Sequence, residues 1–274
     1  MRKVKITILA AVLVGFAGLV ACNDKHTDER QTTASKVLAA QQTTTQKPAE
    51  KPDVDEDEEG EEGPATPGAV PAEKPAPQQT SGTFAYSFDS DTPGQLPGKF
   101  HAARTGSGAE SKWAVMADPT APSKPNAVAQ TSTDQTDYRF PLLISDEGIF
   151  QDLDLTVKFK AVSGNIDRAG GLVFRLKDPN NYYIVRANAL ENNYRLYHVV
   201  NGRRRQFAGA NFKVTSGEWH ELRVEAVGNK ITCYYDGSKK IETRDDTFKK
   251  AGKVGLWTKA DSVTHFDDLK VTAK

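Results

Sequence analysis

Apolar and polar side chains alternate along much of the chain from residue 83 onward. In DLDLTVKFK (residues 152–160), apolar residues occupy every second position from Leu153 to Phe159, and acidic, basic or hydroxyl side chains lie between them. A period of two predicts a β-strand with one buried face. No stretch after residue 83 sustains the 3.6-residue period of an amphipathic helix.

Turn signals separate this pattern into many short strands. Polar or glycine-containing pairs interrupt the apolar runs at Asn192-Asn193, Asn201-Gly202, Gly228-Asn229 and Asp236-Gly237. Asparagine or aspartate followed by glycine favours the tight turns of β-hairpins. More than ten closely spaced strands with almost no helix predict an all-β fold, an antiparallel β-sandwich or barrel.

The same alternation assigns side chains to the two faces of the strands. In GGLVFRL (residues 170–176) it places Leu172, Phe174 and Leu176 in the core and Arg175 on the opposite face. Applied to the strands that follow, it places Tyr183, Val185 and Leu196 in the core and predicts a second set of outward residues, rich in arginine and aromatic rings. With Arg175, this predicted ligand-binding set is Tyr182, Arg186, Asn188, Arg195, Tyr197 and Trp257.

The outward set has the chemistry of a sugar groove. Arginine and asparagine supply fixed donors for hydroxyl or carboxylate oxygens, and tyrosine and tryptophan supply flat apolar faces that match the C–H face of a pyranose. The alternative interpretation is a set of ordinary solvent-facing positions, where arginine stems cover aromatic neighbours.

The N-terminal part differs in composition from the rest. Residues 1–21 have a basic start and a short apolar run, which predict a secretory signal rather than a spanning helix. The sequence Leu19-Val20-Ala21-Cys22 resembles the lipobox of bacterial lipoproteins, which implies lipidation of Cys22 and an exported, envelope-anchored protein, most readily at the outer membrane. Residues 22–82 are rich in proline, glutamine, threonine and glutamate, and predict a disordered tether.

Charge and cysteine content narrow the functional classes. The chain has 36 basic and 36 acidic side chains, of which residues 1–82 hold 9 and 13, so the remaining domain is only weakly basic. This balance argues against a nucleic-acid partner. If Cys22 is acylated, Cys233 has no disulfide partner, and its place in ITCYYDG predicts a small buried side chain.

The order of these segments resembles a known group of domains. GGLVFRLKDPNNYYIVRANALENNYRLYHVVNGRR, GEWHELRVEA, CYYDG and KVGLWTKADSVTHFDDLKV occur in the order seen in laminin-G-like or concanavalin A-like jelly rolls. More narrowly, the chain from about Phe84 to the C-terminus, including the opening FDSDTPGQLPGKF, resembles the bacterial 3-keto-disaccharide hydrolase domain, which is related to family 16 glycoside hydrolases. The jelly-roll domain is expected to span residues 83–274. The resemblance implies a jelly roll that binds carbohydrate. The alternatives are a hydrolase or lyase acting on (3-keto-)glycosides, and a protein-interaction or structural module of the envelope.

Evidence for catalysis is weaker than evidence for binding. The E-x-D-x-x-E run of family 16 glycosidases is absent from the sequence, and ordinary glycoside hydrolysis requires paired carboxylates. Glu191 and Glu218 lie near turns and would serve as acid or base only if folding brings them to the groove. His198, His220 and His265 are too scattered to define a metal site, so the catalytic residues stay unknown.

One irregularity is expected near the C-terminus. Phe266 and Leu269 can both point inward only if Asp267-Asp268 forms a β-bulge. Related jelly rolls often hold structural calcium in this region, which implies a calcium site with Asp89 and Asp267 as ligands. No cofactor is otherwise required.

Overall fold

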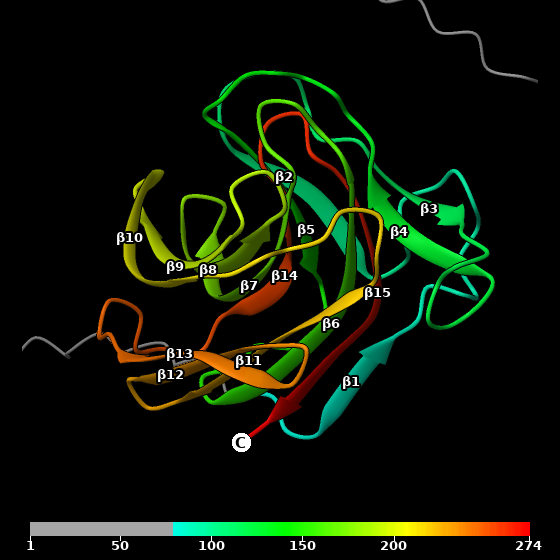
Figure 1. Ribbon diagram of the computed structural model, residues 1–274. Helices are drawn as coiled ribbons and strands as arrows, with labels where there is room; N and C mark the ends of the chain where they lie inside the picture. Colours follow the sequence, from blue (N-terminus) through cyan, green and yellow to red (C-terminus); the bar gives the residue numbers. More distant parts are fainter. Residues whose placement is uncertain (1–78) are drawn as a thin grey trace, which may run out of the picture. The chain divides into compact units, whose positions relative to one another are not determined.

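A computed structural model describes residues 79–274, which form two antiparallel β-sheets without a helix (Figure 1). Sheet A has the order β13-β12-β11-β6-β15-β4-β3. Strand β1 pairs with residues 269–272 of β15, beyond the residues that pair with β4. Its strands are β1 (Thr83–Tyr86), β3 (Trp113–Ala117), β4 (Asn126–Gln130), β6 (Leu153–Ser163), β11 (His220–Val227), β12 (Lys230–Tyr235), β13 (Ser238–Arg244) and β15 (Val263–Ala273).

Sheet B has the order β10-β9-β8-β7-β14-β5-β2, and in Figure 1 β7 to β10 lie over β11 to β13 of sheet A. Its strands are β2 (Phe100–Gly106), β5 (Arg139–Ser145), β7 (Ala169–Asp178), β8 (Asn181–Asn188), β9 (Asn193–Val200), β10 (Arg203–Asn211) and β14 (Lys253–Trp257). The all-β sandwich predicted from the alternation is confirmed. No helix within residues 79–274 is long and apolar enough to cross a membrane.

The first core lies between the two sheets. The apolar side chains of β6 from Leu153 to Phe159 are fully buried there, as the alternation predicted. Tyr183 and Val185 of β8 and Leu196 of β9 face them from sheet B, also as predicted. Cys233 is buried in the same core, and burial raises the pKa of its thiol well above the usual range.

A second apolar cluster covers the other face of sheet B. Its members, which include Phe140, Tyr182, Ile184, Tyr197 and Trp257, are all buried. The alternation assigned Tyr182, Tyr197 and Trp257 to this face correctly, but the expectation that the face is open to solvent is wrong. Trp257 has no exposed surface.

Strong curvature of sheet B explains why this face is closed. The Thr105 hydroxyl of β2 lies 2.7 Å from the Tyr182 hydroxyl of β8, although these strands are four places apart in the sheet. In a flat sheet they would be roughly 19 Å apart. The Tyr138 hydroxyl, just before β5, also donates to Gly202 O of the β9–β10 turn at 2.6 Å. The sheet therefore curls until its far strands meet across the second cluster.

Arg175 departs from the predicted pattern because of a bulge in β7. The pairing with β8 shifts register between Phe174 and Asp178, and Arg175 has a φ of 48°. This positive φ reverses the alternation, so that Leu176 joins the outer cluster instead of the core between the sheets. Arg175 is only 1% exposed, and the prediction that it faces a groove is corrected.

The buried Arg175 guanidinium joins three loops. It donates to the backbone carbonyls of Gln151 at 2.7 Å, Phe248 at 2.9 Å and Gly228 at 2.7 Å. Buried donors and acceptors are stable only when they are paired. Arg175 is therefore a structural residue of the end of the sandwich.

The bulge predicted at Asp267-Asp268 is confirmed. The β15–β6 register shifts between Asp267 and Lys270, Asp268 has a φ of 49°, and both Phe266 and Leu269 lie in the inner core. Asp267 is fully buried.

The calcium site predicted at this bulge is not tested by the structure and stays a prediction. Asp267 accepts from Ser123 N at 2.9 Å, and Asp89 accepts from Asn126 N at 3.1 Å. Within residues 79–274, no three His, Cys, Asp or Glu side chains are grouped to hold a metal ion. Metal analysis of the purified protein would show whether calcium is bound.

Asp267 should make the stability of the domain depend on pH. Burial, partly offset by the Ser123 hydrogen bonds, raises the pKa of Asp267 from 3.8 to about 6. The folded state thus binds this proton more tightly, so the stabilisation is fully present below pH 3.8 and is lost as the pH rises through 6. Between pH 4.5 and 7.5, we expect the wild type to lose about 1–3 kcal/mol relative to Asp267→Asn, which cannot ionise.

Urea denaturation of both proteins at several pH values would measure this difference. The comparison cancels the opposite contribution of His265, whose pKa is lowered mainly by burial. Parallel pH profiles for the two proteins would contradict the assignment.

Candidate functional site

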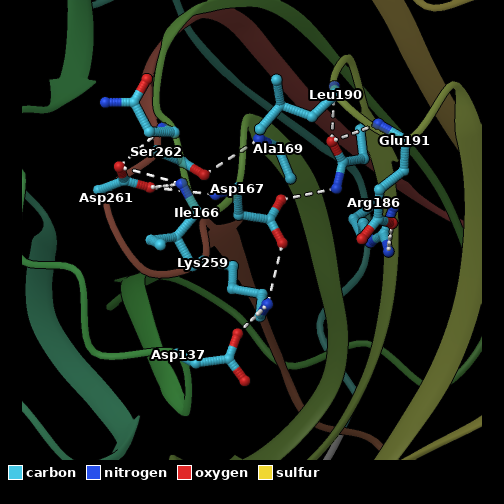
Figure 2. Close-up of polar contacts among 12 residues, drawn as sticks. Asp137, Ile166, Asp167, Ala169, Arg186, Leu190, Glu191, Lys259, Asp261 and Ser262 are labelled. Carbon is cyan, nitrogen blue, oxygen red and sulfur yellow. Dashed lines mark hydrogen bonds and ion pairs between the residues drawn. The ribbon is translucent and has the colours of Figure 1, made fainter.

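Polar side chains gather at one end of sheet B, where three loops meet (Figure 2). The loops are the β6–β7 loop (164–168), the β8–β9 turn (189–192) and the β14–β15 loop (258–262). The Asp261 carboxylate accepts from the backbone N–H groups of residues 165, 166 and 167 at 2.7, 3.0 and 3.0 Å. One side chain thus fixes the β6–β7 loop to the β14–β15 loop.

Asn188, the last residue of β8, connects two of these loops. Its Nδ2 donates to Asp167 Oδ1 at 2.7 Å, and its Oδ1 accepts from Leu190 N at 2.9 Å. Asparagine is suited to such a turn because its amide can bond to the backbone two residues on.

Five charged residues at this end are defined here as the rim cluster: Asp137, Asp167, Arg186, Glu191 and Lys259. Figure 2 shows Lys259 between two carboxylates, with Nζ 2.5 Å from Asp137 Oδ1 and 3.1 Å from Asp167 Oδ2. Arg186 Nη2 lies 2.9 Å from Glu191 Oε2. The cluster therefore joins residues from four segments that are distant in sequence.

The carboxylates of the rim cluster differ in burial and in pKa. Asp167 is 1% exposed, and burial raises its pKa. The Asp137 side chain is 75% exposed, and the hydrogen bond from Lys259 lowers its pKa. Burial opposes ionisation of Glu191, but hydrogen bonding by Asn193 and the charge of Arg186 hold its pKa below the usual value.

An aromatic platform lies next to the rim cluster. Phe140 and Trp257 stack with their ring centroids 5.4 Å apart. The Arg204 guanidinium carbon lies 4.6 Å from the Phe140 and Tyr197 centroids and 5.6 Å from that of Trp257. Guanidinium groups favour such positions over aromatic faces. Arg204, from edge strand β10, thus covers the platform.

Three of the predicted ligand-binding residues lie at this end of the sheet. Arg186 is 4% exposed and donates to the Tyr197 hydroxyl at 3.0 Å and to Asn193. Gly171 on the neighbouring strand leaves room for it, since an added Cβ there would approach Arg186 Cβ to 2.9 Å. The three residues are thus Arg186, which belongs to the rim cluster, and Tyr197 and Asn188, which contact it. Their binding role stays a prediction.

The other predicted residues lie elsewhere. Trp257 is itself a ring of the buried platform, and Tyr182 is buried in the same apolar cluster. The Arg195 guanidinium donates to Ala210 O of β10 at 2.8 Å. Arg175 lies in the loops described above. The structure adds Asp137, Asp167, Lys259 and Arg204, which no local sequence motif marks. For Arg204, the run of three arginines after Asn201-Gly202 was the available signal.

The remaining acid, base and metal candidates are not brought to the rim cluster. His198, His220 and His265 each lie within 3.7 Å of a different aspartate, Asp245, Asp236 and Asp118. Glu218 accepts from Thr215 at 2.9 Å. Glu191 is the only one of these candidates found at the rim cluster in the described residues.

Solved structures with a similar fold were found by comparison. A Bacillus subtilis protein of unknown function with a galectin-like fold has a TM-score of 0.50 and 10% identity, over 71% of this chain and 97% of that one. The Bacillus licheniformis beta-glucanase has a TM-score of 0.49 and 13% sequence identity, over 72% of this chain and 100% of that one. The carbohydrate binding module CBM66 from Bacillus subtilis has a TM-score of 0.47 and 23% sequence identity, over 52% of this chain and 85% of that one. The first of these supports the fold alone.

No curated protein matches the chain. The model of the 3-keto-alpha-glucoside-1,2-lyase-like domain matches residues 100–272, which is more than half of the chain and nearly all of the two sheets. The resemblance found in the order of strands and turns is thereby confirmed, and the chain belongs to the family of 3-keto-alpha-glucoside-1,2-lyase-like domains.

Proposed function

We propose that the domain binds carbohydrate at the rim cluster. The observation that carries this proposal is the concentration of fixed hydrogen-bonding groups of both kinds, donors and acceptors, in the rim cluster. Sugar recognition needs such groups because each hydroxyl both donates and accepts. Membership of a family named for a glucoside-cleaving activity supports the same ligand class.

The exposed parts of the rim suit a sugar ring. Asp137 and Glu191 have partly or largely exposed carboxylates and would accept hydrogen bonds from hydroxyls. Ile166 and Leu190, which precede Asp167 and Glu191 in the sequence, are 43% and 41% exposed and would cover apolar C–H groups. Figure 2 shows them on the two loops that carry these acids.

Binding is favoured over hydrolysis by the state of the carboxylates. Asp137 and Glu191 are accessible but have lowered pKa values, which makes them weak bases. Asp167 has a raised pKa but is buried under Asn188 and Lys259. No pair of the kind used by retaining or inverting glycosidases is therefore assigned.

A lyase acting on 3-keto-glycosides is the second candidate, and family membership favours it. In such an elimination, a base removes a proton from the carbon next to the ketone, and the glycosidic oxygen leaves and takes up a proton. Glu191 is the residue on which the base role would fall. Mass spectrometry after incubation with a 3-keto-glucoside decides between the candidates, since a binding module releases no aglycone.

Replacing Glu191 by glutamine should weaken sugar binding about tenfold or more. A hydrogen bond to a charged group contributes about 1.5–3 kcal/mol, and 1.4 kcal/mol corresponds to a factor of ten. Glycan-array screening followed by calorimetry would measure the loss. Glu242→Gln is the matched control, because Glu242 is also half-exposed and ion-paired but lies on β13 of sheet A.

Equal affinity of the Glu191→Gln variant and the wild type would place the ligand elsewhere. Binding to no sugar on the array would shift the function to a protein partner.

We also propose that the protein is attached to the envelope through lipid on Cys22. Residues 1–78, which include Cys22, lie outside the described part of the chain, so this proposal depends on the sequence pattern alone. Metabolic labelling with a fatty acid should mark the wild type and leave Cys22→Ser unlabelled.

A further inference from the structure

We propose that the sugar bound at the rim cluster carries a carboxylate, and that Arg204 binds it. This inference rests on the carbohydrate-binding function proposed above and narrows it to one class of sugar.

Arg204 differs from Lys259 and Arg186 because no carboxylate forms an ion pair with it in the described domain. Lys259 lies between Asp137 and Asp167, and Arg186 contacts Glu191. Arg204 forms no ion pair with any residue of the described domain, and its Nη1 is buried without a hydrogen-bond partner. A guanidinium that is partly withdrawn from water and unpaired favours an anion.

The surroundings of Arg204 strengthen this preference. Arg203 and Arg205 flank it on β10 and are exposed, and neither is ion-paired within residues 79–274. Together the three arginines make β10 basic, although Arg203 and Arg205 project from the face opposite to that of Arg204. The positive potential of such a strand attracts anionic ligands and raises their rate of association.

A second unpaired donor lies against the same aromatic ring. The Arg186 guanidinium carbon is 5.7 Å and that of Arg204 is 4.6 Å from the Tyr197 centroid. Arg186 Nε is buried and, like Arg204 Nη1, has no partner. A carboxylate has two oxygens and can accept from two guanidinium groups, whereas a neutral hydroxyl offers a weaker, uncharged acceptor. An acidic sugar would offer such a donor the charged acceptor that the described domain does not provide.

The experiment compares sugars that differ only in the acid group. Binding of the wild-type protein to methyl β-glucuronide and methyl β-glucoside, and to the corresponding galacturonide and galactoside, would be measured by calorimetry. We expect at least one acidic sugar to bind about tenfold more tightly than its neutral counterpart, equivalent to one charge-assisted hydrogen bond. High salt should reduce this preference.

Two variants test the role of Arg204. Arg204→Gln keeps a polar side chain without charge and should reduce the preference for the acidic sugar to about twofold or less. Arg205→Gln removes the same charge from an exposed neighbour and should keep the preference. Circular dichroism and melting temperature would establish folding, and Arg204→Lys, which keeps the charge but not the planar fork, replaces Arg204→Gln if that variant does not fold.

The outcomes separate the two proposals. Equal binding of acidic and neutral sugars, or a preference that persists in Arg204→Gln, overturns this inference and leaves carbohydrate binding intact. Failure of both sugar classes to bind overturns carbohydrate binding itself.

Discussion

Replacing Arg175 by methionine should lower the free energy of unfolding by about 3–5 kcal/mol, the cost typical of breaking a buried charged network. The variant leaves the carbonyls of Gln151, Gly228 and Phe248 without their donor. Phe248 is buried, and an unpaired buried acceptor costs about 1–3 kcal/mol, whereas Gln151 and Gly228 are exposed residues whose carbonyls can bond to water. For a domain of this size the melting temperature should fall by roughly 10 °C.

Arg195→Met is the matched control for this prediction. Arg195 also lies on sheet B, but it is half-buried and its main contacts are to β10, so its loss should cost about 1 kcal/mol or less. Chemical denaturation of the two variants would measure both values. Similar stabilities would show that the three loop carbonyls find other donors, and would contradict the structural role of Arg175.

Replacing Trp257 by alanine should cost about 3–5 kcal/mol, because it removes the largest side chain of the second apolar cluster. The cavity cannot fill with water favourably, since Phe140 and Leu142 line it. The variant also removes part of the surface under Arg204. Any loss of sugar binding should therefore be interpreted only after stability has been measured.

Trp219→Ala provides the comparison for Trp257. Trp219 is half-buried and contacts Lys160 at 4.9 Å from its ring centroid, so its removal should cost less than half as much. If thermal unfolding gives equal losses for both variants, the outer face of sheet B is not a second core.

Local alternation predicts well on which face of a sheet a side chain lies, as the strands of sheet B show. Tyr183 and Val185 were placed inward and Tyr182 and Arg186 outward, and all four assignments are confirmed. The period of two is a property of the pleat, so it needs no knowledge of the rest of the chain. It fails at Arg175, where a positive φ occurs without the glycine or asparagine that would signal it.

Whether a face of a sheet is exposed to solvent is a different property, and alternation within one strand cannot predict it. Trp257 is on the predicted side of β14, yet it is buried because Thr105 and Tyr138 bring distant strands over it. Those contacts join residues dozens of positions apart in sequence. The same holds for the rim cluster, whose pairs Lys259–Asp137 and Lys259–Asp167 have no counterpart in any short motif.

The curvature of sheet B divides the domain into a part that tolerates change and a part that does not. Every residue of β5 and all but the first of β8 are buried, so a polar substitution there would disturb one apolar layer or the other. The rim cluster depends on loops whose exposed positions, such as Ile166 and Leu190, belong to neither apolar cluster. A new ligand specificity would therefore be engineered most readily by exchanging these loops on an unaltered sheet.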